Sequence, residues 1–148
     1  MSRSEPVEIL LVEDNPNDVE LTLHALRKNN LSNRIEVARD GAEALEFIFR
    51  NGAGSWSGPQ YRPKVILLDL KLPKVDGLEV LKRLKSDPET KSIPVVVLTS
   101  SREECDVVKS YELGVNSYIV KPVDFEQFTI AVRQVGLYWL LMNQAATQ

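Results

Sequence analysis

The sequence contains few of the residues that form covalent cross-links or soft-metal sites. It has one cysteine, Cys105, and one histidine, His24, among 148 residues. A single cysteine excludes an intrachain disulfide and a cysteine-rich metal centre. No apolar run approaches the roughly 18 residues of a membrane span. The first six residues, Met-Ser-Arg-Ser-Glu-Pro, lack the apolar stretch of a secretory signal, so we expect a soluble, cytoplasmic protein.

The chain also lacks a basic excess. Its formal net charge is -3, with an isoelectric point near 5.3. This balance argues against a nucleic-acid or anionic-membrane surface as the partner. Hydrophobic residues make up 43% and charged residues 26% of the sequence, which is typical of a globular protein. We therefore expect one domain over residues 1–148, with a core at about 7–142.

Short apolar runs alternate with stretches of helical periodicity. The runs are nearly continuous rather than alternating, which predicts strands buried on both faces of a parallel sheet. The expected strands are Val7–Val12, Ile35–Ala38, Lys64–Leu68, Ile93–Leu98 and Ser117–Val120. The helical stripes are Val19, Leu23 and Leu26; Ala42, Leu45 and Phe49; Leu78, Leu81 and Leu84; Cys105, Val108 and Tyr111; and a fifth stripe after Asp124.

This alternation predicts an α/β fold with a doubly wound, five-stranded parallel sheet. Asp124 suits the N-cap of the fifth helix, and Gln127 lies three residues further on, as in a capping box. Residues 51–62 are rich in Gly, Ser and Pro and predict an extended surface loop.

Polar residues stand where four of the five strands end. Ligand sites in open parallel sheets form at the carboxyl ends of strands, so we expect these side chains to meet. The candidates are Glu13 and Asp14 after the first strand, Asp69 at the end of the third, Thr99 at the end of the fourth, and Lys121 after the fifth.

Three carboxylates cannot stay ionised together in one pocket without compensation. Two like charges about 4 Å apart repel by roughly 4 kcal/mol at an effective dielectric constant of 20. Lys121 supplies one positive charge and a divalent cation would supply two more. Hard oxygen ligands without histidine or cysteine favour Mg²⁺ or Mn²⁺. Together, a metal, a lysine, a hydroxyl and a carboxylate nucleophile predict phosphoryl transfer onto Asp69.

At these residues the sequence resembles the receiver domain of two-component response regulators. The matching segments are Ile9–Asp14, Val65–Pro73 with Asp76-Gly77, Val95–Ser100 and Gly114–Pro122. The resemblance implies the flavodoxin-like (βα)5 fold with strand order 2-1-3-4-5. It also implies a stand-alone regulator that accepts a phosphoryl group from a sensor histidine kinase and signals through protein contacts. Such a protein catalyses its own phosphorylation and dephosphorylation, and it is a signalling protein rather than a turnover enzyme.

The resemblance also assigns roles to residues. Asp69 would be the phosphoacceptor, Asp14 a direct Mg²⁺ ligand and Glu13 a ligand mainly through water. The backbone carbonyl of Lys71 would complete the protein ligands. Lys121 would pair with the phosphoryl group, and its bond to Pro122 resembles a position that is usually cis. The residues expected to switch on phosphorylation are Thr99 and Tyr118.

Within this family the chain is most similar to regulators paired with bacterial phytochromes, so a phytochrome kinase is an expected partner. The fifth helix is expected to extend over about 124–143 with apolar surface on several faces, which favours a homodimer. A tail folded back on its own domain is the alternative. The expected dimer residues are Phe128, Val132, Val135, Leu137, Tyr138, Trp139, Leu141 and Met142.

The sequence leaves other functions open. A receiver that never takes phosphate, an interaction module only, is one alternative. A phosphatase of the haloacid-dehalogenase type also uses an Asp nucleophile, but it needs an acid two residues later, where this chain has Lys71. An FMN carrier would need a phosphate-cradling loop after the first strand, where Glu13 and Asp14 would repel phosphate.

Overall fold

The computed structural model describes residues 8–27, 34–49, 63–100, 112, 114–115 and 117–134. The predicted loop at 51–62, the Cys105 helix and the chain after residue 134 lie outside these ranges. The elements, in order, are β1 (Ile9–Val12), α1 (Pro16–Arg27), β2 (Ile35–Ala38), α2 (Gly41–Phe49), β3 (Val65–Asp69), α3 (Gly77–Ser86), β4 (Val95–Thr99), β5 (Ser117–Val120) and α5 (Phe125–Gln134).

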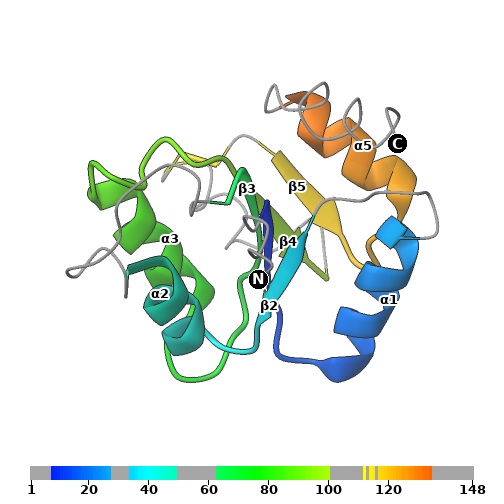
Figure 1. The fold of residues 1–148 in the computed structure, drawn as a ribbon, viewed down its shortest axis with the longest axis horizontal. Coiled ribbons are helices and arrows are strands. Elements are labelled where there is room, and N and C mark those ends of the chain that lie inside the picture. The colour runs from blue at the N-terminus through cyan, green and yellow to red at the C-terminus, as the bar shows by residue number, and fades with distance from the viewer. Residues whose placement is uncertain are drawn as a thin grey trace, which may run out of the picture.

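The five strands form one parallel sheet in the order β2-β1-β3-β4-β5, which confirms the predicted topology. Figure 1 shows α2 and α3 on one face of this sheet and α1 and α5 on the other. The strands are therefore covered on both sides, and every residue of β1, β3 and β4 is buried. This double burial explains why the runs are apolar throughout rather than at alternate positions.

Successive strand residues contribute to two separate halves of the core. Leu10 of β1 packs in the cluster that contains residues of α2 and α3, whereas Ile9 and Leu11 pack in the cluster with α1 and α5. The second cluster also contains Phe128, which is fully buried. Phe128 was expected in a dimer interface, and this is wrong: its ring fills the space between α5 and the sheet and exposes no surface to a partner.

Side chains at the helix starts satisfy backbone N–H groups that have no partner inside the helix. Asn15 accepts hydrogen bonds from the backbone of Asn17 at 2.8 Å and Asp18 at 3.1 Å at the start of α1. Asp124 accepts one from the backbone of Gln127 at 2.8 Å, as predicted for α5. These caps fix where α1 and α5 leave the edge of the sheet at which the candidate site lies.

Gly77, the first residue of α3, lies against the loop that follows β3. Its backbone N–H donates to the carbonyl of Leu70 at 3.0 Å. A Cβ atom at this position would lie 2.4 Å from the backbone oxygen of Asp69, far inside van der Waals contact. Only glycine lets the start of α3 approach Asp69 this closely.

Some sequence expectations shift in detail. β4 begins at Val95 and not at Ile93, because Pro94 has no N–H to donate to a neighbouring strand, although its carbonyl accepts from Ile66 at 3.0 Å. In α2 the predicted stripe began at Ala42, but Ala42 is exposed. The buried residues of that helix are Gly41, Ala44, Leu45 and Ile48.

Candidate functional site

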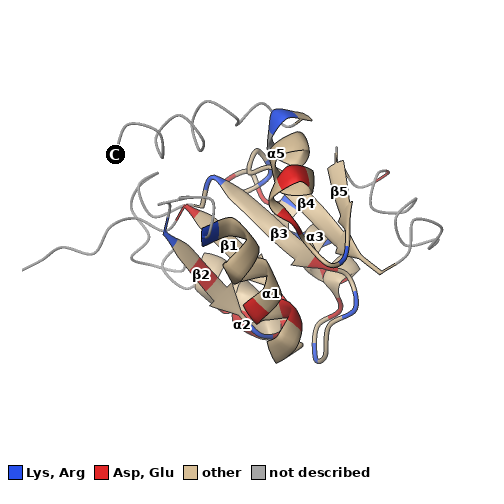
Figure 2. Cartoon of the chain, turned by 90° about the vertical axis from the view of Figure 1, so that its right-hand side faces the viewer, with Lys and Arg blue, Asp and Glu red and all other residues tan. Residues whose placement is uncertain are grey.

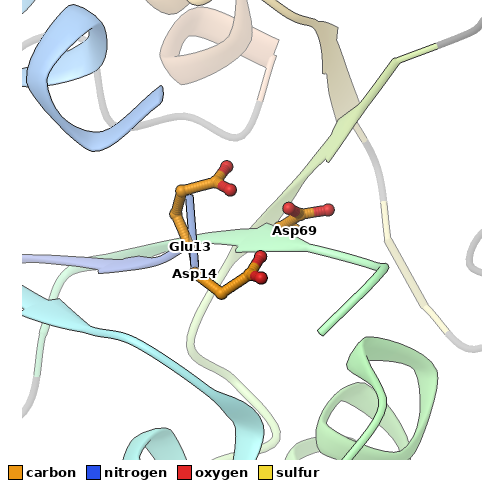
Figure 3. Close-up of side chains that lie close together, drawn as sticks. All are labelled: Glu13, Asp14 and Asp69. Atoms are coloured by element: carbon orange, nitrogen blue, oxygen red, sulfur yellow. The ribbon is translucent and has the colours of Figure 1, made fainter. Parts of the chain in front are cut away.

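Three carboxylates converge where β1 and β3 end. The register pairs Val12 with Leu68, so Glu13 and Asp69 follow at the same level of the sheet. One oxygen of each of Glu13, Asp14 and Asp69 lies within 4.8 Å of the others. Figure 3 shows Glu13 and Asp14 extending from the end of β1 beside Asp69 at the end of β3. The sequence prediction that these side chains meet is confirmed.

The ammonium group of Lys121 lies among the carboxylates. Its Nζ is 3.1 Å from Asp69 Oδ2, 3.1 Å from Glu13 Oε1 and 3.2 Å from Asp18 Oδ2. The backbone N–H of Lys121 donates to the carbonyl of Thr99 at 2.7 Å, which fixes the lysine beside the end of β4. The Lys121-Pro122 peptide bond is cis, in agreement with the resemblance.

Backbone donors hold the other oxygens of two of these carboxylates. The N–H of Lys71 donates to Asp69 Oδ1 at 3.0 Å, and the N–H of Asn15 donates to Glu13 Oε2 at 3.2 Å. Each of these carboxylates is therefore oriented by one backbone N–H and by Lys121. Their side chains are 7% and 1% exposed, so the orientation is held in a largely water-excluded place.

These groups surround a cavity of about 220 Å³ that opens to solvent. Thr99, 2% exposed at the end of β4, lies on its wall as predicted. The cavity is lined by Glu13, Asp14, Asn15, Asp18, Asp69, Leu70, Lys71, Thr99, Ser100 and Lys121. Its size suits a hydrated cation with a phosphoryl group, and its walls carry carboxylates, a hydroxyl and lysines.

The clustering of charge changes the ionisation of the site. Burial, followed by the neighbouring charge of Asp69, raises the pKa of Glu13 to about 7. Burial alone would lower the pKa of Lys121, but the charges of Asp69 and Glu13 outweigh it and hold this pKa above its usual range. Lys121 therefore stays protonated at neutral pH, while without a further cation the carboxylates repel one another.

Asp18 was missed by the sequence analysis. It lies in the first turn of α1, where an acidic residue is ordinarily explained by the helix dipole. The structure turns its carboxylate toward Lys121. The acidic residues coloured red in Figure 2 recur on α1 and where β3 ends. A signal was present in the sequence, because Asp18 lies only four residues after Asp14, but the orientation of α1 decides where its side chain faces.

The remaining predicted residues are not among those that line the cavity, or they lie outside the described ranges. Tyr118 of β5 is half-buried and packs against the core cluster that contains α2 and α3. The dimer residues Val135, Leu137, Tyr138, Trp139, Leu141 and Met142 fall outside the described ranges, and the placement of the Val132 side chain is not described. Among the described residues, no helix has both the length and the apolarity needed to cross a membrane.

Residues 9–133 match the response regulator receiver domain family. This chain belongs to that family. The match extends from β1 to the last turn of α5 and includes every residue that lines the cavity.

Several solved receivers are similar along nearly their whole length. The structure of the bacteriophytochrome response regulator AtBRR is 56% identical, with a TM-score of 0.80, and the match covers 92% of this chain and 96% of that one. Response regulator Rcp1 of Synechocystis is 42% identical over 91% of this chain and 90% of its own length. Its Mn²⁺-bound crystal structure has a TM-score of 0.68. The phosphorylated phytochrome response regulator RcpA is 42% identical, with a TM-score of 0.70 and coverage of 93% and 96%.

Membership assigns a general role. Receivers act in two-component signalling, where a sensor kinase supplies the phosphoryl group, so the predicted function class and partner class are confirmed. The phosphatase and FMN-carrier alternatives, which the sequence already disfavours, are not supported by any of the similar proteins described above.

Proposed function

We propose that Asp69 of this chain is the phosphoacceptor, in a reaction that depends on Mg²⁺ or Mn²⁺. The observation that carries this proposal is the placement of Asp69 between two other carboxylates and the ammonium group of Lys121, 3.1 Å away. Its side chain is only 7% exposed, yet it lines a cavity that opens to solvent. A buried, oriented carboxylate with access for a phosphodonor is the arrangement that a nucleophile requires.

The donor set fits a hard divalent cation. Glu13, Asp14 and Asp69 offer only oxygen ligands, within 4.8 Å of one another, and their charges exceed what Lys121 neutralises. We assign them, with the backbone carbonyl of Lys71, to hold Mg²⁺ or Mn²⁺. When bound, the cation supplies positive charge for the oxygens of the transferred phosphoryl group. Support comes from Rcp1, which was solved in its Mn²⁺-bound form.

Each protein residue of the site has its own role in phosphoryl transfer. An oxygen of Asp69 forms the new bond to phosphorus while the bond to the histidine nitrogen of the kinase breaks, and the released imidazole takes up a proton. Lys121 pairs with a phosphoryl oxygen, because its ammonium is already directed at Asp69. Thr99, on the cavity wall, donates its hydroxyl to another oxygen. Tyr118 then changes rotamer together with Thr99.

The sensor kinase that acts on this chain is inferred from a similar protein. We propose a bacterial phytochrome as the sensor kinase, since AtBRR is described as a bacteriophytochrome response regulator.

We also propose a homodimer through the C-terminal helix, with an interface that does not include Phe128. One observation supports association there, since Ile130 of α5 is a large apolar side chain with 52% exposure. Sedimentation would test the dimer, and a strict monomer at micromolar concentration would contradict it.

The phosphoacceptor is tested by labelling with acetyl phosphate in the presence and absence of Mg²⁺. We expect wild-type protein to gain one phosphoryl group only with the metal, and Asp69→Asn to gain none. Asp124→Asn is the matched control, because asparagine caps α5 as well as aspartate does, and it should label normally. Absence of labelling in the wild-type protein would favour the phosphorylation-independent interaction module instead.

A further inference from the structure

Lys121 uses all of its hydrogen-bonding capacity on carboxylates. An ammonium group has three N–H donors. Three carboxylates, those of Asp69, Glu13 and Asp18, lie at 3.1, 3.1 and 3.2 Å from Nζ. Two of these partners come from strand ends and the third comes from the first turn of α1, and all three line the cavity.

The three partners differ in what else they are required to do. Glu13 and Asp69 belong to the carboxylate cluster that we assign to the cation, and Asp69 also receives the phosphoryl group. Asp18 is outside that cluster, and its side chain is 30% exposed, against 1% for Glu13 and 7% for Asp69. Asp18 is therefore the carboxylate partner of Lys121 to which neither of these other roles is assigned.

We propose that Asp18 is a positioning residue for phosphoryl transfer: it anchors the ammonium group of Lys121 over Asp69 while the other two carboxylates are engaged. This inference rests on the proposed function of Asp69. A lysine side chain has high rotamer entropy, and a fixed partner reduces the ordering that the transition state must otherwise impose. Asp18 acts through Lys121 and does not touch the phosphoryl group.

The negative charge of Asp18 has a second physical effect, which slows phosphorylation instead of assisting it. A further negative charge at the cavity wall repels an incoming phosphodonor. If repulsion dominated, removal of the charge would accelerate phosphorylation. If anchoring dominates, removal slows it, by about two- to fivefold, which is the range for a partly exposed ion pair. The direction of the change therefore separates the two effects.

The test measures labelling by acetyl phosphate at saturating Mg²⁺, so that altered metal affinity does not enter the rate. For Asp18→Asn we expect the maximal first-order rate constant of labelling to fall about two- to fivefold, with little change in the acetyl phosphate concentration that gives half of it. Asp18→Glu, which keeps the charge, should recover part of the loss. Glu20→Gln is the matched control, because it removes an exposed charge from the same helix and should label like wild type. An unchanged or higher rate constant of labelling in Asp18→Asn would overturn the proposal.

A second comparison tests whether Asp18 acts through Lys121. In a Lys121→Met background, Asp18→Asn should no longer change the labelling rate, because the group that it positions is gone. A retained two- to fivefold loss in that background would overturn the anchoring role. If wild-type protein labels and Asp18→Asn behaves like it, only this inference fails. If wild-type protein does not label, the proposed function fails, and this inference fails with it.

Discussion

The two ends of β1 and β3 carry charges in different proportions. At the amino ends, a lysine lies beside a carboxylate: Lys64 Nζ is 2.7 Å from Glu8 Oε2. At the carboxyl ends, the ammonium of Lys121 is shared by three carboxylates. Asp14 adds a fourth carboxylate there. The same pair of strands thus ends in a balanced ion pair on one edge and in an excess of negative charge on the other.

The ion pair at the amino ends is compatible with folding alone, whereas the carboxylates at the carboxyl ends lower the stability of the folded protein. The Lys64–Glu8 pair is partly exposed, at 37% and 15%, and each charge has its counter-ion. At the other edge, burial and mutual repulsion raise the pKa of Glu13 to about 7. Such an arrangement destabilises the metal-free protein, so it is explained by cation and phosphoryl binding and not by folding.

Adding Mg²⁺ should give the largest change in stability, because it supplies the positive charge that the carboxyl ends lack. At a concentration one hundred times its Kd, the free energy of unfolding should rise by about 2.7 kcal/mol. Chemical denaturation with and without the ion measures this. Equal stabilisation of a Glu13→Gln, Asp14→Asn double variant would show that the ion binds elsewhere.

The next effect is expected in metal-free buffer with Glu13→Gln. The pKa of Glu13 is about 7 in the folded protein, against 4.5 for an ordinary glutamate side chain. The stability gained by protonating Glu13 is therefore complete below pH 4.5 and is lost as the pH rises through 7. At pH 8 the glutamine variant should be more stable than wild type by about 1–3 kcal/mol, and at pH 4.5 this advantage should disappear. Denaturation midpoints across this range provide the measurement.

An advantage of Glu13→Gln that did not depend on pH would contradict this electrostatic explanation. Addition of Mg²⁺ at pH 8 should reverse the order of the two proteins, because the cation favours the ionised carboxylate that only the wild type has.

Asp14→Asn should weaken Mn²⁺ binding at least tenfold, or about 1.4 kcal/mol, because a direct carboxylate ligand becomes a neutral amide. Asp14 is exposed, so the fold should be little affected. Calorimetric titration of the metal gives the affinity, with Asp124→Asn as control. Unchanged affinity would remove Asp14 from the ligand set.

The smallest effect is expected at the balanced edge. Glu8→Gln breaks a partly exposed ion pair and should lower the free energy of unfolding by about 0.2–1 kcal/mol. Neither Mn²⁺ affinity nor labelling of Asp69 should change. A change in either would mean that the two edges of the sheet are coupled through β1 and β3, and the contrast between them would no longer hold.

Sequence patterns predicted the strands, the parallel sheet and the meeting of Glu13, Asp14, Asp69, Thr99 and Lys121. The strand order came from the resemblance to receiver domains. The reason is that all strands of a parallel sheet point the same way, so residues just after their ends share one edge whatever their separation in the chain. Helix faces were less predictable. The stripe in α2 was misplaced at Ala42, and Phe128 was assigned to a surface although it fills the core.

The sequence by itself determined which residues stand at the strand ends and that their charges need a cation, because both depend only on order along the chain and on side-chain chemistry. The tertiary structure decided that Lys121 is shared among three carboxylates and that Asp18 is one of them. That outcome depends on the rotation of α1 against the sheet, which is set by the packing of Val19 and Leu26 in the core. Such a rotation results from many contacts at once, and no local sequence pattern specifies it.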